Sequence, residues 1–378
     1  SGDLMKRISS ALLVASSLII STSIANADQF VRMVSGPSGG SWYPLGAKVM
    51  QVMESEIKGI STSNTSGGGI SNVLAVDGGD AEIGWTYAHT VANGYTGKGK
   101  FKKAHKNVRY FATLYGAAFQ VAVRADSKIK SFEDMKSANI SPGKPKWTGT
   151  AFCESILKEY GFDFETIKKN GGVVHQGDYK ESVALMKDGQ TDVFMAATSV
   201  PQASFIELEN SPGIRFIGLP KDRMDRIVKN NPGYIYGNIP ASAYKSLDKD
   251  IPTLGIVTSM IVHKDLSDDL VYKMTKSFWD NHAEFVKVKS VWKRVLLKKA
   301  VDGAAVCIAG PNFDESAARR SAKHVHGSHV AVASLRACPA VPRARAPLGP
   351  LGYLAGDRAR RRIAIRRLYE GGTVRATA

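Results

Sequence analysis

Short apolar runs alternate with segments of helical periodicity from residue 28 to about residue 300. Of all the features of the sequence, this alternation restricts the possible folds most strongly. It predicts an α/β fold with a largely parallel sheet, because parallel strands need a crossover connection, usually a helix, between them. We expect strands at 30–35, 60–65, 81–86, 108–113, 119–124, 172–175, 191–196 and 214–218. We expect helices at 43–57, 69–77, 149–160, 179–187, 201–209 and 266–285.

A weak internal repeat suggests two similar lobes. The segments "NVLAVDGGDAEIGW" (72–85) and "SVALMKDGQTDVFM" (182–195) align without gaps at an offset of 110 residues. Each has a helical stretch, a glycine turn and an acidic residue that opens a strand. The repeat therefore predicts two α/β lobes that each send a strand-end loop toward a shared cleft, unless so short a match is a coincidence.

The first residues have the pattern of a secretory signal. Lys6 and Arg7 precede an apolar run from about 11 to 20, and Ala25-Asn26-Ala27 has the small-x-small pattern of a cleavage site. We expect a signal peptide over 1–27, with extra residues before Met5, and a periplasmic mature chain. The apolar run is short for a membrane span, although an N-terminal anchor is the alternative.

The net charge of +17 raises the question of a nucleic-acid partner, but its distribution argues against one. Residues 301–378 carry 13 basic and 5 acidic residues, a net +8, and their basic residues are nearly all Arg where those before are mostly Lys. We expect 301–378 to be an aberrant, frameshifted or disordered basic tail. The alternative is a genuine tail that binds anionic surfaces, as in an adhesin or an immunogenic surface protein.

Three glycine-rich turns each lie between a predicted strand and a predicted helix. They are Gly36–Gly40, the "TSGGG" turn at 65–69, and the turn at Thr148-Gly149-Thr150. Helix N-termini present unpaired backbone N–H groups and a positive dipole end, so they can hold a carboxylate or phosphate. Ordinary capping by the Ser and Thr hydroxyls is the structural alternative. Aromatic residues lie beside these turns, where α/β clefts open: Trp42, Tyr43, Trp85, Tyr87 and Trp147.

Catalysis and metal binding have weaker support. Gly36-Pro37-Ser38-Gly39-Gly40 fits the G-x-S-x-G nucleophile elbow, so an exported serine hydrolase using Ser38 is the alternative function. The turn follows the first strand, however, so no earlier loop can complete an oxyanion hole. Cys153, Cys307 and Cys338 are isolated and have no metal-ligand spacing, and Cys153 is expected to be buried. We expect no catalytic residue, cofactor or metal.

The ordered set "SGPSGGSWYPLGAKV", "SNTSGGGISNVLAVDGGDAEIGW", "WTGTAFCESILKEYG" and "LMKDGQTDVFMAATSVPQAS" resembles the TAXI group of solute receptors of tripartite (TRAP) transporters. The resemblance covers about 28–300 and implies a type II periplasmic binding protein, with two α/β lobes around a ligand cleft joined by crossover strands. We assign 28–118 plus 220–300 to one lobe and 119–219 to the other. The sequence departs from the family after about Gly303.

The resemblance implies a solute receptor and not an enzyme. The solute would be a small carboxylate (a dicarboxylate, keto acid or acidic amino acid), delivered to a TRAP-type membrane permease. Trp42 and Trp147 depart from the family pattern, so the ligand can differ from the usual ones. The implied ligand contacts are Gly39, Gly40, Ser41, Tyr43, Ser66, Gly67, Asn72, Trp85, Thr86, Tyr87, Thr148, Gly149, Thr150, Thr198 and Pro201.

Overall fold

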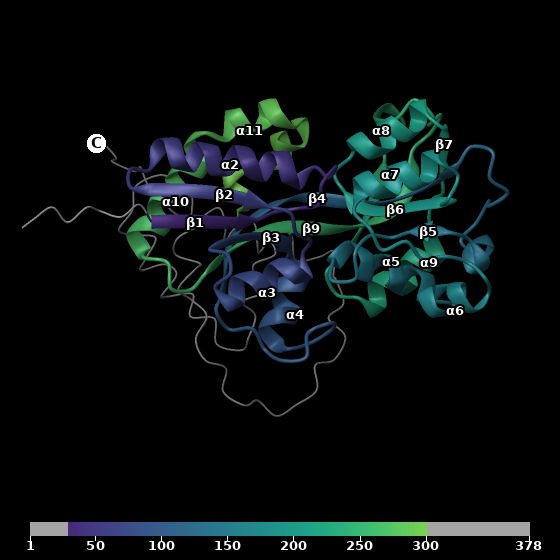
Figure 1. The fold of residues 1–378 in the computed structure, drawn as a ribbon, viewed down its shortest axis with the longest axis horizontal. Helices are drawn as coiled ribbons and strands as arrows, with labels where there is room; N and C mark the ends of the chain where they lie inside the picture. The colour runs from purple at the N-terminus through teal and green to yellow at the C-terminus, as the bar shows by residue number, and fades with distance from the viewer. Residues whose placement is uncertain (1–28, 301–378) are drawn as a thin grey trace, which may run out of the picture. The chain divides into compact units, whose positions relative to one another are not determined.

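The computed structural model describes residues 29–300, which form a mixed α/β structure around one curled sheet (Figure 1). The predicted signal peptide (1–27) and basic tail (301–378) lie outside the described residues. The sheet has the strand order β2-β1-β3-β9-β4-β6-β5, while β7 pairs with β4 and β8 with β9. Its strands are β1 (Gln29–Val34), β2 (Ile60–Thr65), β3 (Ile83–Tyr87), β4 (Val108–Arg124), β5 (Ile140–Ser141), β6 (Val193–Thr198), β7 (Ile214–Phe216), β8 (Tyr234–Ile239) and β9 (Ile251–His263).

Helices cover both faces of the sheet (Figure 1). They are α2 (Trp42–Glu56), α3 (Ile70–Gly78), α4 (Ala88–Thr96), α5 (Thr148–Glu159), α6 (Phe164–Lys169), α7 (Tyr179–Lys187), α8 (Ala203–Asn210), α9 (Lys221–Asn230), α10 (Asp268–Asp280) and α11 (His282–Val288). We call β1–β3 with α2–α4, α10 and α11 the first half, and β5–β8 with α5–α9 the second half. Each half buries its own apolar cluster on one face, and a larger cluster runs through both.

Two long strands join the halves. β4 pairs with β9 through its first part and with β6 and β7 through its last part. The predicted strands 108–113 and 119–124 are thus one strand of 17 residues, which stays extended through the predicted gap. Register shifts between Tyr110 and Ala112 and between Thr113 and Gly116 interrupt the ladder without ending it.

The prediction of a largely parallel sheet is wrong at its centre. Only β1–β2, β1–β3 and β5–β6 are parallel pairs. The pairs made by β4 and β9 are antiparallel, because these strands run between the halves in opposite directions and need no helical crossover.

The residues after 220 lie differently from the predicted lobe assignment. Helix α9 packs against α5, and Arg226 of α9 forms an ion pair with Glu159 of α5. The chain returns to the first half along β9, which begins at Ile251. The prediction of 266–285 as one helix is also wrong, because the helical conformation is interrupted at Asn281, between α10 and α11. The predicted strand 172–175 is reduced to a single bridge between Val174 and Ile140.

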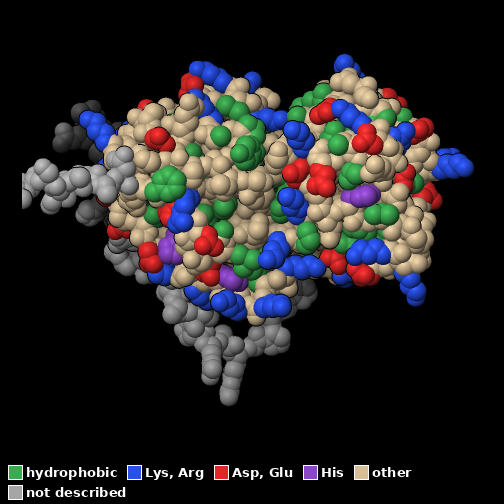
Figure 2. Space-filling view, viewed as in Figure 1, with side chains coloured by type: hydrophobic (Ala, Val, Ile, Leu, Met, Phe, Trp, Pro, Cys, Tyr) green, Lys and Arg blue, Asp and Glu red, His purple; other side chains and the backbone are tan. Residues whose placement is uncertain are grey.

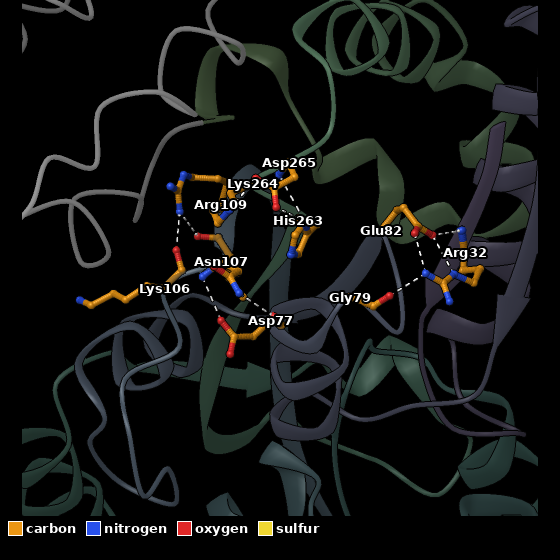
Figure 3. Close-up of polar contacts among 11 residues, drawn as sticks. Arg32, Asp77, Gly79, Glu82, Lys106, Asn107, Arg109, His263, Lys264 and Asp265 are labelled. Atoms are coloured by element: carbon orange, nitrogen blue, oxygen red, sulfur yellow. Dashed lines mark hydrogen bonds and ion pairs between the residues drawn. The ribbon is translucent and has the colours of Figure 1, made fainter.

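The sequence repeat has a structural counterpart in the two halves. Glu82 accepts the backbone N–H of Arg32 at 2.6 Å and donates its own N–H to the Arg32 carbonyl at 3.0 Å (Figure 3). Asp192 forms the same reciprocal pair with Asn139, at 3.0 and 2.8 Å. In both halves an acidic residue just before one strand thus bonds the neighbouring segment, within β1 at Arg32 and just before β5 at Asn139.

Candidate functional site

The carboxyl ends of β1, β2, β3, β5 and β6 converge where the two halves meet. Open α/β sheets bind ligands beyond the carboxyl ends of their strands. A cavity of about 20 Å³ lies there, with room for about one water molecule. We call it the central cavity; its lining residues are Pro37, Gly40, Ser41, Trp42, Gly68, Gly69, Tyr87, Trp147, Thr148, Gly149, Tyr179, Ala197 and Thr198.

Four helices begin at the central cavity, and none of them has a side-chain cap. The N-cap residues of α2, α3, α4 and α5 are Ser41, Gly69, Tyr87 and Trp147, and all four line the cavity. By contrast, α6, α7, α8 and α10 are each capped by a side-chain oxygen. The ends of four helices without side-chain caps therefore line one small space, and their dipoles favour an anionic group there, although the Ser71 N–H of α3 already donates to the Lys146 carbonyl at 3.0 Å.

Aromatic rings form the walls between these helix ends. The ring centroids of Trp42 and Tyr87 are 4.9 Å apart, and those of Trp147 and Tyr179 are 5.7 Å apart. All four side chains are buried. None of the lining residues carries a charged side chain, and the Lys144 ammonium lies 6.0 Å from the ring centroid of the wall residue Trp147.

The two tyrosines of the wall are held neutral. Burial raises the pKa of Tyr87 well above its ordinary value, and burial likewise raises that of Tyr179. The Tyr87 hydroxyl donates a 3.0 Å hydrogen bond to the carbonyl of Ala197. Tyr87 belongs to the first half and Ala197 to the second, so this bond also joins the halves.

Further hydrogen bonds cross the cleft around the cavity. The hydroxyls of Ser41 and Ser199 lie 2.6 Å apart, and those of Thr90 and Thr148 lie 3.1 Å apart. Gln202 donates from Nε2 to the Gly39 carbonyl at 2.6 Å. These contacts hold the halves together at the mouth of the cavity.

The structure brings six of the fifteen predicted ligand contacts to the cavity wall. They are Gly40, Ser41, Tyr87, Thr148, Gly149 and Thr198. Gly39 contributes a carbonyl to the contacts across the cleft and is not part of the wall.

Four predicted contacts support the wall from behind. Asn72 is buried; it donates to the carbonyls of Ser35 and Trp85 and accepts from the Gly68 N–H at 2.8 Å. The Trp85 side chain is fully buried, with its indole N–H 2.9 Å from Met260 Sδ. Thr86 donates to the Gly69 carbonyl, and Thr150 to the Pro142 carbonyl.

The remaining four predicted contacts lie away from the wall. Tyr43 is 39% exposed and faces a groove between α2 and β2. Ser66 and Pro201 are exposed, and Gly67 is half-buried with its N–H bonded to the Gly36 carbonyl. These residues lie within three positions of a lining residue in sequence but not on the cavity wall.

Seven lining residues were not among the predicted contacts: Pro37, Trp42, Gly68, Gly69, Trp147, Tyr179 and Ala197. Trp42 and Trp147 were visible as aromatic residues beside the glycine turns. Gly68 and Gly69 belong to the predicted "TSGGG" turn. Tyr179 begins α7, and no local pattern in the sequence separates it from a core tyrosine.

Among residues 29–300, the structure places no histidine as a base for the Ser38 hydrolase alternative. Ser38 is absent from the cavity wall. Each histidine of the described residues contacts another group: His89 with Thr90, His105 with Asp77, His175 with Gln190, His263 with Asp265 and His282 with Trp292. A serine nucleophile needs a base within hydrogen-bond reach, and no histidine among residues 29–300 is so placed for Ser38.

Other chemical features of the described residues are simple. Cys153 is fully buried as predicted, and burial raises the pKa of its thiol; Cys307 and Cys338 lie outside the described residues. Within residues 29–300, no group of three His, Cys, Asp or Glu side chains is placed to hold a metal ion. No helix in this range combines the length and apolarity that crossing a membrane requires.

Comparison with known proteins gives one family match. The profile of the NMT1-like family matches residues 33–309. A solved structure described as a periplasmic transporter is 16% identical, with 69% of this chain and 86% of that chain covered and a TM-score of 0.45. An ancestral arginine-binding protein bound to arginine is 12% identical, with 70% and 99% covered and a TM-score of 0.41. The alkanesulfonate-binding protein SsuA from Xanthomonas axonopodis pv. citri, bound to MOPS, is 12% identical, with 73% and 81% covered and a TM-score of 0.41.

Proposed function

Because the chain belongs to the NMT1-like family, we propose that it is an exported solute receptor that binds a small organic anion at the central cavity, without turnover. The observation that carries the proposal is the convergence of four uncapped helix N-termini between aromatic walls. The helix ends would receive a carboxylate, and the rings would cover the rest of the solute. Dicarboxylates, keto acids and acidic amino acids fit this chemistry.

Binding requires the halves to move apart. Ligand pockets commonly measure roughly 300 Å³ or more, whereas the central cavity holds about 20 Å³. β4 and β9 are the strands that join the halves, so bending of these strands would open the site. The solute then favours closure by the difference between its affinities for the closed and open forms.

A thermal-shift screen tests the proposed ligand class. A carboxylate present at about 100 times its Kd stabilises the native state by about 2.7 kcal/mol, which raises Tm by roughly 5–10 °C for a chain of this size. Each carboxylate is compared with its primary amide at equal concentration, since the amide keeps the shape and loses the charge. Equal shifts with acid and amide would argue against an anion site, and no shift across the panel would argue against the receptor function.

The partner we propose is a TRAP-type permease in the membrane, driven by a cation gradient. Periplasmic export is part of the same proposal, and fractionation of the source cells tests it. Uptake of the labelled solute should need the receptor and should stop when an ionophore collapses the cation gradient. Uptake that survives the ionophore but stops on ATP depletion would indicate a different class of transporter.

A further inference from the structure

The loop between α4 and β4 is strongly basic. The loop and the first two residues of β4, together 97–109, contain six Lys and Arg and no acidic residue, namely Lys98, Lys100, Lys102, Lys103, Lys106 and Arg109. All five lysines are exposed. Figure 2 shows Lys and Arg side chains gathered along the lower edge of this face, where α3 and α4 lie in Figure 1. Ligand binding at the central cavity uses none of these side chains.

Contacts with α3 and with the apolar cluster of the first half hold this loop in place. The Asp77 carboxylate on α3 accepts the Asn107 N–H at 2.9 Å, and the Asn107 side chain donates to the Asp77 carbonyl (Figure 3). The same carboxylate lies 2.7 Å from His105 Nδ1. Phe101 is buried in the cluster under α3 and α4. The loop therefore presents its lysines from a fixed base.

The positive charge of the loop is poorly balanced by nearby acids. Lys100 pairs with Glu154 of α5 at 2.8 Å, but Glu154 also pairs with Lys158 at 3.0 Å, so two lysines share one carboxylate. Among the described residues, Lys98, Lys102 and Lys103 have no ion-pair partner. We call these three the loop lysines.

From this geometry we infer that the α4–β4 loop is an electrostatic docking surface for a bilayer that carries anionic phospholipid headgroups. Lysine is a compact, strongly hydrated point charge, which suits a diffuse anionic surface. Protein interfaces are instead enriched in aromatic residues and Arg and depleted of Lys. Here Phe101 is buried, and the Lys106 ammonium covers the Tyr95 ring at 3.5 Å. The loop thus exposes charge without an aromatic anchor, and adsorption should be electrostatic without insertion.

This inference goes beyond the proposed function, because a receptor can bind its solute without touching lipid. It is tested by sedimentation of the mature full chain with vesicles of phosphatidylcholine, with and without about one third phosphatidylglycerol. Binding to the anionic vesicles alone is expected at about 50 mM NaCl, with most of it lost at about 500 mM, because salt screens exposed charges.

The decisive comparison is between two triple variants of equal charge. The test variant carries Lys98→Gln, Lys102→Gln and Lys103→Gln. The control carries the same change at three exposed lysines far from the loop in sequence: Lys58→Gln, Lys128→Gln and Lys169→Gln. Each lysine near an anionic surface contributes about fivefold to the partition coefficient, so the test variant should bind on the order of 100-fold more weakly. The control should bind within a few-fold of the parent chain.

Residues 301–378 carry a net +8 and are present in all three proteins. Binding that depends on them alone would leave the two variants equal, and equality overturns the inference. Failure of the parent chain to bind the anionic vesicles overturns it as well.

A second readout is the acetylation rate of individual lysines: vesicles should protect the loop lysines and leave the three control lysines unprotected. The opposite pattern of protection would place the contact elsewhere. Neither result depends on whether the solute has been found.

Discussion

Adding one methyl group at Gly149 tests the central cavity with little risk to the fold. Gly149 is the second residue of α5 and lines the cavity. A Cβ built there lies 3.9 Å from the Ala197 nitrogen and 4.0 Å from Ala197 Cβ and the Tyr179 hydroxyl, which are ordinary van der Waals distances. Alanine also favours helix over glycine by up to about 1 kcal/mol. We therefore expect Gly149→Ala to unfold at the parent Tm or about 2 °C above it.

The same methyl group should be costly to binding. The central cavity holds about 20 Å³, so a methyl on its wall occupies space that a closing solute needs. Overpacking by one methyl typically costs about 1–3 kcal/mol, which corresponds to a loss of roughly 5–150-fold in affinity. Stability and affinity should thus change in opposite directions.

Titration calorimetry with the best carboxylate from the thermal-shift screen measures the loss. The matched control is Gly78→Ala, which adds a methyl to an exposed helical glycine at the end of α3, where the nearest atom is Asp80 Oδ2 at 3.5 Å. Its Kd should equal that of the parent. If Gly149→Ala folds normally and binds as tightly as the control, the solute does not lie against the start of α5 and the proposed site is refuted.

Three further changes test other parts of the structure. Burial lowers the pKa of His89 to about 4, so the folded protein keeps this histidine neutral while the unfolded chain protonates it below about pH 6.5. The free energy of unfolding should therefore fall by about 2 kcal/mol more in the parent than in His89→Gln between pH 7.5 and pH 5. Parallel pH profiles of the two proteins would contradict this. Asn72→Ala should lower the free energy of unfolding in urea by about 3 kcal/mol, because it strands buried backbone groups; a cost below about 0.5 kcal/mol would contradict the bracing role. Ser38→Ala should leave solute affinity unchanged, and any ester or amide hydrolysis that disappears with this change would revive the hydrolase alternative.

Local features of the fold could be predicted from the sequence because local chemistry determines them. The helices at 43–57, 69–77 and 179–187 match α2, α3 and α7 within one residue at each end. The signals for these helices are local in the sequence: the spacing of their apolar residues, and a glycine shortly after the end of α3 and of α7. Gly79 and Gly189 both adopt a positive φ, which residues with a side chain disfavour.

The direction of the long strands could not be predicted in this way. β9 was missed although β8 precedes it closely in the chain; its other neighbours, β3 and β4, come from distant parts of the chain. Pairing partners decide whether a strand is parallel or antiparallel, and an apolar run has the same appearance in both. The parallel prediction followed from counting helices between strands, and β4 and β9 do not follow that rule.

In the candidate site too, the residues near the glycine turns could be predicted from the sequence, but their contacts with distant parts of the chain could not. Trp85 and Tyr87 lie on one face of β3, two residues apart, yet Tyr87 lines the cavity while Trp85 packs between Trp42 and Trp292 in the core. The difference is one step of about 7 Å along the strand. Trp292 covers the deeper position and comes from a 3₁₀ turn at Ser290–Arg294, over 200 residues later in the chain. No pattern around β3 can reveal that cover.

If the proposed function is right, the hydrogen bonds across the cleft limit how tightly the chain can bind its solute. Contacts such as Ser41 with Ser199 and Gln202 with Gly39 form without any help from a solute, so they favour the closed form. A solute that enters only the open form has its apparent affinity reduced by the open fraction. Each such bond contributes about 1 kcal/mol net, so a few of them already make the open form a minor state. The uncapped helix ends act differently, because an anion reaches all four only after closure. We therefore expect the helix ends to set which solute is held, and the bonds between the halves to set how often the site is open to receive it.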